Sequence, residues 1–154
     1  MSSTLPPTAE ELDELLCFDL YAAQRAVTAA YRPVLGRLGL TYPQYLVLVL
    51  LWGRGDCTVR EVADALRLDH GTLTPLLRRM ETSGLLTRTR GTDDERTVRL
   101  RLTAVGLELE AHRDDVQCQI ADAMGLHARA VVTLQRLLRR VGDSTRAALE
   151  DAEV

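Results

Sequence analysis

The spacing of apolar residues changes twice along this 154-residue chain, and the change limits the folds that the chain can adopt. Up to about residue 83, apolar side chains recur at three- and four-residue steps, which predicts helices. Residues 85–90 and 97–102 then have the pattern of two short strands, and the second alternates clearly. Helical spacing returns after residue 103. We therefore expect a mainly α fold with a small β-hairpin, whose loop is residues 91–96.

Capping and turn residues divide the helical parts into segments. Thr58, with Glu61 three residues later, forms a capping box that begins one helix. Asp69 is a suitable N-cap for the next helix. Pro33 is expected to bend or break the first helix near its end. The expected helices are Glu10–Leu38, Pro43–Trp52, Val59–Leu66, one that Asp69 begins and Gly84 ends after Ser83, and two after Thr103 that divide near Met124–Gly125.

Helices followed by a hairpin, in this order, are typical of a winged helix-turn-helix domain. We expect one domain, residues 1–154, in which 43–103 is the winged-helix DNA-binding region. Residues 10–40 and 104–150 would be N- and C-terminal dimerisation helices, because they carry more apolar surface than so small a middle region can cover. A second chain can cover that surface, which predicts a homodimer. The alternative is a three-helix packing within one chain.

Charge is unevenly distributed along the chain. The net charge is −3, but residues 67–101 contain eight arginines and five acidic residues, a local balance of +3. A local basic patch is what affinity for nucleic acid requires. The longest apolar run, Tyr45–Trp52, is too short to span a membrane, and the acidic N-terminus lacks the features of a signal peptide. A cytoplasmic protein is therefore expected.

The cysteines and histidines do not form a metal-binding pattern. They are widely separated: Cys17, Cys57, Cys118, His70, His112 and His127. Neither zinc-ligand spacing nor a structural disulfide framework fits them. A nucleophile with its base and a phosphate-binding glycine loop are also missing from the sequence. We expect no metal, no cofactor and no enzyme activity; a peroxidase acting through Cys17 is the enzyme alternative.

Residues 68–103, LDHGTLTPLLRRMETSGLLTRTRGTDDERTVRLRLT, combine a basic helix end with a wing that contains Asp-x-Arg. This segment resembles the DNA-binding core of the MarR family and, within it, the OhrR regulators that respond to organic peroxides. It departs from the family pattern at His70, where serine is usual, which affects the expected base preference but not the fold. The expected DNA-binding residues are His70, Gly71, Thr72, Thr74, Arg78, Arg79, Arg88, Arg90, Asp94 and Arg96.

These residue types suit the contacts that such a domain makes with a duplex. A recognition helix presents short polar and basic side chains to base edges and phosphates. Arg96, in the hairpin loop, suits the narrow and electronegative minor groove, and Asp94 can hold its guanidinium group in position. For any one of the other arginines taken alone, a solvated surface is the alternative explanation.

Residues 16–48 resemble the sensor region of the OhrR regulators. The family's reactive cysteine matches Cys17, and three family tyrosines match Tyr21, Tyr31 and Tyr42. Cys17 and Tyr21 are four residues apart and share one helix face. Tyr31 follows Cys17 by fourteen residues, about 21 Å of helix, so it cannot reach the thiol of its own chain. The resemblance implies a site built across the subunit interface, where phenols stabilise a thiolate.

Cys118 is the candidate resolving cysteine. It is offset by about 200° on a helix from both Val116 and Ile120, so it should point away from their apolar row and be accessible. Two-cysteine OhrR regulators carry a resolving cysteine in this region, and the resemblance implies that Cys118 attacks an oxidised Cys17. Cys57 lies beside a helix cap and is expected to be structural. An unreactive, half-buried thiol is also the alternative for Cys17.

The sequence thus predicts a repressor that binds inverted-repeat operator DNA as a homodimer when it is reduced. An organic hydroperoxide would release it by oxidising Cys17. The alternative is a MarR-type repressor that a small phenolic ligand releases. That protein would share residues 68–103 and would differ at Cys17, Tyr31 and Tyr42.

Arg96→Ala should weaken DNA binding for all duplex sequences alike and lower its dependence on salt, because a wing arginine acts through groove potential and phosphates. Each phosphate contact that is lost lowers the slope of log affinity against log salt by about 0.9. Equilibrium binding over a salt series measures both effects. An unchanged affinity and slope would remove the wing from the predicted interface.

Overall fold

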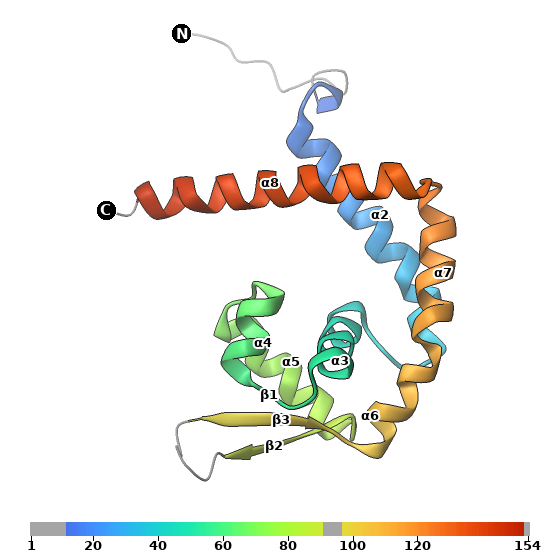
Figure 1. The fold of residues 1–154 in the computed structure, drawn as a ribbon, viewed down its shortest axis with the longest axis vertical. Helices are drawn as coiled ribbons and strands as arrows, with labels where there is room; N and C mark the ends of the chain where they lie inside the picture. Colours follow the sequence, from blue (N-terminus) through green and yellow to red (C-terminus); the bar gives the residue numbers. More distant parts are fainter. Residues whose placement is uncertain (1–11, 91–96, 153–154) are drawn as a thin grey trace, which may run out of the picture. The chain divides into compact units, whose positions relative to one another are not determined.

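The fold is mainly helical, with one small sheet (Figure 1). The computed structural model describes residues 12–90 and 97–152. Its elements are α2 (Leu16–Gly36), α3 (Tyr42–Arg54), β1 (Cys57–Thr58), α4 (Val59–Leu66), α5 (His70–Thr82), β2 (Leu86–Arg90), β3 (Val98–Leu102), α6 (Ala104–Glu108), a 3-10 helix (Leu109–His112), α7 (Arg113–Met124) and α8 (Ala128–Ala152). In these described residues, no helix is both long and apolar enough to cross a membrane. The chain divides into two compact units after Ile120.

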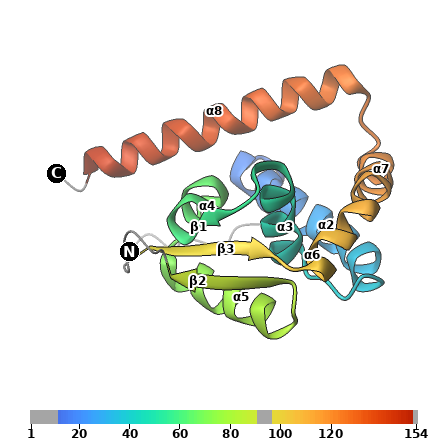
Figure 2. The ribbon, with the colours of Figure 1, turned by 60° about the horizontal axis from the view of Figure 1, so that its bottom comes forward.

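The sheet has three strands, with β3 between β1 and β2 (Figure 2). β2 and β3 form the predicted hairpin and pair in antiparallel fashion, with Leu86 opposite Leu102. β1 pairs antiparallel with the other edge of β3, with Cys57 opposite Leu100. β1 was not expected, because a strand of two residues is too short for an alternating pattern to reveal.

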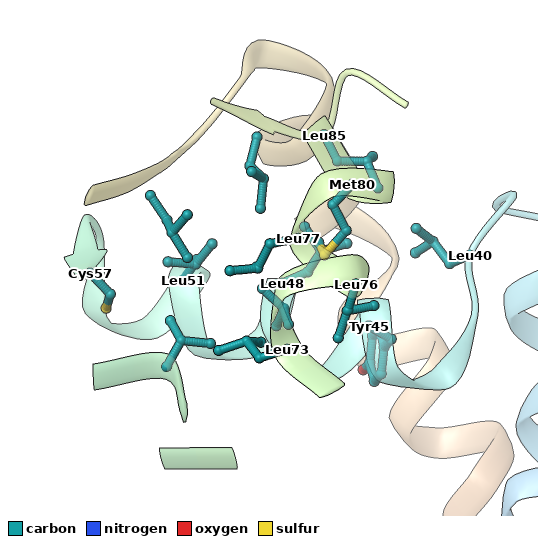
Figure 3. Close-up of a cluster of buried hydrophobic side chains, with 14 of the residues drawn as sticks. Leu40, Tyr45, Leu48, Leu51, Cys57, Leu73, Leu76, Leu77, Met80 and Leu85 are labelled. Atoms are coloured by element: carbon teal, nitrogen blue, oxygen red, sulfur yellow. The ribbon is translucent and has the colours of Figure 1, made fainter. Parts of the chain in front are cut away.

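The core of the first unit lies among α3, α5 and the sheet (Figure 3). α5 contributes Leu73, Leu76, Leu77 and Met80, each at most 4 % exposed. Their three- and four-residue spacing places them on one side of the helix. Burying each such side chain contributes about 1.5–3 kcal/mol relative to leaving it in water. α5 is therefore anchored along one side, and its other side is exposed.

Hydrogen bonds confirm two of the predicted helix starts. Thr58 Oγ1 accepts from the backbone N–H of Glu61 at 3.1 Å, and the Glu61 carboxylate accepts from the backbone N–H of Thr58 at 2.6 Å. At the start of α5, the Asp69 carboxylate accepts from the backbone N–H of Thr72 at 2.8 Å. Gly84 follows this helix with a φ of 71°, the left-handed conformation that favours glycine. Local side-chain chemistry thus fixes where α4 and α5 begin.

The first helix differs from the expected segment Glu10–Leu38. Residues 12 and 13 are helical, but Glu14 and Leu15 interrupt the helix before α2 begins. Leu15 is extended, with φ −91° and ψ 109°. The apolar spacing continues across this interruption and could not reveal it. Pro33 lies inside α2 and does not break it; because Pro33 is exposed, water can satisfy the carbonyl that its missing N–H leaves unpaired.

The helical region after the sheet is divided twice. The expected division near Met124–Gly125 is confirmed, with Gly125 in a left-handed conformation at φ 63°. The 3-10 helix between α6 and α7 was not expected. α8 has no buried residue, and its exposed large apolar side chains are Val132, Leu134, Leu137, Leu138, Val141 and Leu149.

Gly106 lies at the joint between the sheet and α6. A Cβ atom at this position would collide with the carbonyl oxygen of Leu85. The backbone N–H of Thr103 donates to the same oxygen at 3.1 Å. The indole N–H of Trp52 donates to the carbonyl oxygen of Gly106 at 2.9 Å. The backbone of α6 therefore packs directly against the point where β2 follows α5.

Gly106→Ala should lower the free energy of unfolding by about 1–3 kcal/mol, because the added methyl group overpacks against a backbone carbonyl. Urea unfolding measures the change. Gly53→Ala is a matched control, since no atom lies within 4 Å of a Cβ placed on this helical glycine and alanine favours a helix. Equal free energies of unfolding for the two variants would contradict the close contact at Gly106.

Candidate functional site

The exposed side of α5 brings together most of the residues predicted to bind DNA. The predicted residues found there, all exposed, are His70, Gly71, Thr72, Thr74, Arg78 and Arg79. Because the opposite side of α5 is anchored in the core, a rigid element presents these side chains. A helix of this kind can place polar and basic groups in a major groove.

Thr72 and Asp69 form the cap at the start of α5. The Thr72 hydroxyl donates to Asp69 Oδ2 at 2.8 Å, and the Thr72 backbone N–H donates to Asp69 Oδ1 at 2.8 Å. These hydrogen bonds hold the pKa of Asp69 below its usual value. A Cβ at Gly71 would lie only 3.0 Å from Asp69 Oδ1, which favours glycine there. The hydroxyl proton of Thr72 is therefore committed to the cap, while its oxygen can still accept.

The two arginines of β2 differ in their surroundings. Arg88 is half-buried, and its Nε lies 3.2 Å from Glu81 Oε2 on α5. The other oxygen of Glu81 accepts from the Arg88 backbone N–H at 3.2 Å. The side-chain contact is an ion pair in which Nε makes no well-aligned hydrogen bond. Arg90 is exposed, so the structure separates one arginine tied to α5 from one that is open to solvent.

An open pocket lies among the starts of α4 and α5 and the strands β2 and β3. Its lining residues are Thr58, Val59, Arg60, His70, Thr74, Arg88, Thr97 and Val98. Three of the predicted DNA-binding residues therefore meet at one place. Arg60 was missed, although an exposed basic side chain in the first turn after a capping box was a signal for it. The predicted wing residues Asp94 and Arg96 lie outside the described residues.

Cys17 is exposed in the first turn of α2. Tyr21, one turn later, is 56 % exposed, and its hydroxyl accepts from Arg25 Nη1 at 2.9 Å. The Arg25 guanidinium also lies 5.5 Å from the centroid of the Tyr21 ring, a cation–π contact. Tyr31 is on the same helix, about 21 Å from Cys17 along the helix axis. The structure thus places Cys17 and Tyr21 together and Tyr31 apart from them.

Tyr31 and Tyr42 pack against each other, with their ring centroids 4.4 Å apart. Tyr45 is 2 % exposed and extends this cluster, with its ring centroid 5.9 Å from that of Tyr31. Burial raises the pKa of Tyr31 to about 12 and also raises the pKa of Tyr42. Both phenols therefore stay protonated at neutral pH and can donate hydrogen bonds. Tyr45 was missed because its apolar run is typical of a core segment.

The other two cysteines have different surroundings. Cys118 on α7 is exposed, while Val116 and Ile120 beside it are 2 % and 3 % exposed, as the helical offset predicts. Cys57 is buried, its thiol donates to the carbonyl oxygen of Gly55 at 3.5 Å, and burial raises its pKa. Cys57 is therefore a protonated core thiol. Within residues 12–90 and 97–152, no three His, Cys, Asp or Glu side chains form a group that could hold a metal ion.

The sequence matches a known family of proteins. The model of the MarR family matches residues 40–98. The organic hydroperoxide resistance transcriptional regulator of Bacillus subtilis is 44 % identical over 127 residues, which are 82 % of this chain and 84 % of that protein. The chain belongs to the MarR family. This membership makes it a transcriptional regulator, as the bacterial relative is by its name.

Solved structures share the fold of this MarR-family chain. Reduced AbfR bound to DNA has a TM-score of 0.73 and 29 % identity, and the match covers 88 % of this chain and 96 % of AbfR. Disulfide-formed AbfR has a TM-score of 0.62 and 31 % identity, with 86 % of this chain and 93 % of AbfR covered. The predicted fold class, a winged helix-turn-helix domain with flanking helices, is confirmed.

The half-buried phenol of Tyr31 should make the folded state less stable in alkali. Its pKa is about 12 when folded and 10.0 when unfolded. Its contribution to the free energy of unfolding is therefore constant below pH 10.0 and is lost as the pH rises towards about 12. The chain has no lysine, so no lysine titration overlaps this range. Urea unfolding at increasing pH should show that the free energy of unfolding falls less steeply for Tyr31→Phe than for wild type. Tyr21→Phe is the exposed control, and an identical loss in both variants would contradict the burial effect.

Proposed function

We propose that this MarR-family regulator is a homodimeric repressor that senses organic hydroperoxides through Cys17. One observation carries the proposal: the exposed thiol of Cys17 lies about 21 Å along α2 from Tyr31, which packs against Tyr42 of α3 as a half-buried pair of neutral phenols. Two copies of α2 that run in opposite directions about a two-fold axis would set each Cys17 beside the Tyr31–Tyr42 pair of the other chain. A dimer would then complete two sites that a single chain leaves incomplete.

The exposed apolar side chains support a dimer. Leu15 and Leu16 at the start of α2 are 51 % and 64 % exposed. α8 exposes six large apolar side chains and buries none of its residues. A monomeric soluble protein rarely exposes contiguous apolar surface of this kind, because water excludes it. A second copy of the chain is the occupant that suits both surfaces, since the same patches then cover each other.

The exposed side of α5 supports DNA binding. His70, Thr74 and Arg78 would approach base edges and phosphates in the major groove, and Arg79 and Arg90 would approach phosphates. Asp94 and Arg96 would belong to the wing in the minor groove. The similar fold of AbfR, which has been solved bound to DNA, supports this arrangement. Two-fold symmetry predicts an inverted-repeat operator with half-sites about 34 Å apart.

The sensing step is a thiol oxidation. The Cys17 thiolate attacks the terminal oxygen of the hydroperoxide, an S–O bond forms, and the O–O bond breaks. The alkoxide leaves and takes a proton to become an alcohol, and sulfur becomes a sulfenic acid. Half-buried Phe18 and Leu20 give the thiol apolar neighbours that suit an organic peroxide. The Tyr31 and Tyr42 phenols of the partner would donate to the thiolate, and the sulfenic acid would not keep the same hydrogen bonds.

Cys118 of the other chain would resolve the sulfenic acid. Its thiolate attacks the Cys17 sulfur, an S–S bond forms, and the hydroxide that leaves becomes water after taking a proton. The exposure of Cys118 supports this step, and the burial of Cys57 argues against Cys57 as the resolving thiol. AbfR, which is similar in fold, is known in a disulfide-formed state. A thiol reductant would reverse the reaction.

Mixed dimers of Cys17→Ser and Tyr31→Phe/Tyr42→Phe chains test both the chemistry and its placement. In such a dimer, the one remaining Cys17 faces intact tyrosines if the site spans two chains, and faces phenylalanines if it lies within one chain. We expect this Cys17 to be oxidised by cumene hydroperoxide at the wild-type rate. The Tyr31→Phe/Tyr42→Phe homodimer should react about ten-fold more slowly, since hydrogen bonds to a charged group are lost. Thiol-specific mass spectrometry measures both rates.

Two homodimers serve as controls in a DNA-release assay. Cys57→Ser should respond to peroxide like the wild type, and Cys17→Ser should keep its DNA. A Cys17→Ser homodimer that releases DNA normally with peroxide would contradict the proposal. Release of Cys17→Ser by a small phenol would instead support the phenolic-ligand alternative. Slow oxidation in the mixed dimer would contradict the site across two chains.

A further inference from the structure

Four aromatic rings form a continuous row inside the first unit. The row begins with the Tyr31–Tyr42 pair, whose centroids are 4.4 Å apart. Tyr45 lies 5.9 Å from Tyr31, and Trp52 lies 6.1 Å from Tyr45 in an edge-on arrangement at 71°. The proposed thiol site uses only the first two rings. Tyr45 and Trp52, both on α3, have no role in that site, although they continue the row away from it.

The far end of the row reaches the base of the DNA-reading elements. The Trp52 indole N–H donates to the Gly106 carbonyl oxygen at 2.9 Å. Gly106 in turn packs against the carbonyl oxygen of Leu85, so closely that no side chain fits between them. Leu85 stands between the end of α5 and the start of β2. The hydrogen bond of Trp52 therefore ends at the joint that sets how α5 and the hairpin are placed.

The middle of the row contacts a third element. The Tyr45 hydroxyl accepts a long hydrogen bond, 3.5 Å, from Gln117 Nε2 on α7. Gln117 immediately precedes Cys118 in the sequence. Tyr45 is 2 % exposed and packs on Tyr31 and Trp52, so it has no room to absorb a movement of either ring.

We infer that Tyr45 and Trp52 are positioning residues that transmit the state of the Cys17 site to α5 and the hairpin. The inference rests on the proposed function. When oxidation removes the acceptor of the Tyr31 and Tyr42 hydroxyls, that pair repacks, and close packing obliges Tyr45 to follow. Trp52 then moves together with its hydrogen bond to Gly106, and the joint between α5 and β2 shifts. DNA release thus needs no contact between the thiol and the DNA-reading elements.

Trp52→Phe tests the inference, because it keeps a ring and removes the N–H donor. The probe is a duplex selected from a random pool by the reduced wild-type protein, and the oxidant is cumene hydroperoxide. Cys17 should be oxidised at the wild-type rate, but the ratio of DNA dissociation constants between oxidised and reduced protein should fall about five-fold or more. A purely structural role would change both constants alike and leave the ratio unchanged. Tyr45→Phe, which keeps the row of rings, should keep the wild-type ratio.

Wild-type protein provides a second measurement that needs no stable variant. Trp52 is the only tryptophan in the chain, so its fluorescence reports this position alone. Peroxide should change its emission in DNA-free wild type and leave it unchanged in Cys17→Ser. The inference would be overturned if Trp52→Phe kept the wild-type ratio of DNA dissociation constants. It would also be overturned if peroxide released the wild-type protein from DNA without changing the emission of Trp52. Failure of Cys17 to be oxidised would overturn the proposed function itself.

Discussion

The packing of α5 against α3 and the sheet is the contact on which the other features depend. Leu73, Leu77 and Met80 are completely buried there. Their burial fixes the rotation of α5 about its axis, and so decides that His70, Thr74 and Arg78 are exposed. α3, which supports α5 from inside, also carries Tyr42 and Tyr45. Two of the three clustered tyrosines and the candidate DNA-reading surface are therefore carried by one pair of packed helices.

Features that short-range chemistry determines could be predicted from the sequence. The capping box of Thr58 and Glu61 and the cap of Asp69 involve groups three residues apart, and the structure contains both. The interruption at Leu15 could not be predicted, because nothing in the apolar spacing marks it. β1 exists only because Cys57 meets Leu100, a pairing across more than forty residues. The 3-10 helix after α6 had no sequence signal that we can identify.

The candidate site also divides into features that the sequence predicts and features that it does not. The residue types on α5 pointed to its exposed side, and the length of α2 was enough to separate Tyr31 from Cys17. The sequence did not indicate that Glu81 would pair with Arg88, or that Arg60 would line the same pocket as His70. Those arrangements depend on how α4, α5 and β2 come together in three dimensions. Side-chain neighbours across elements are therefore the part of a site that one sequence leaves open.

The cap at the start of α5 has a consequence for base preference. The Thr72 hydroxyl gives its only proton to Asp69, so towards a duplex its oxygen can act as an acceptor but not as a donor. In the major groove, the donors are the amino groups of adenine and cytosine, whereas guanine and the thymine carbonyl offer acceptors. If Thr72 faces a base edge in the proposed complex, it would therefore select adenine or cytosine and disfavour guanine. The carboxylate that caps α5 would thereby also restrict the bases that the proposed recognition helix accepts.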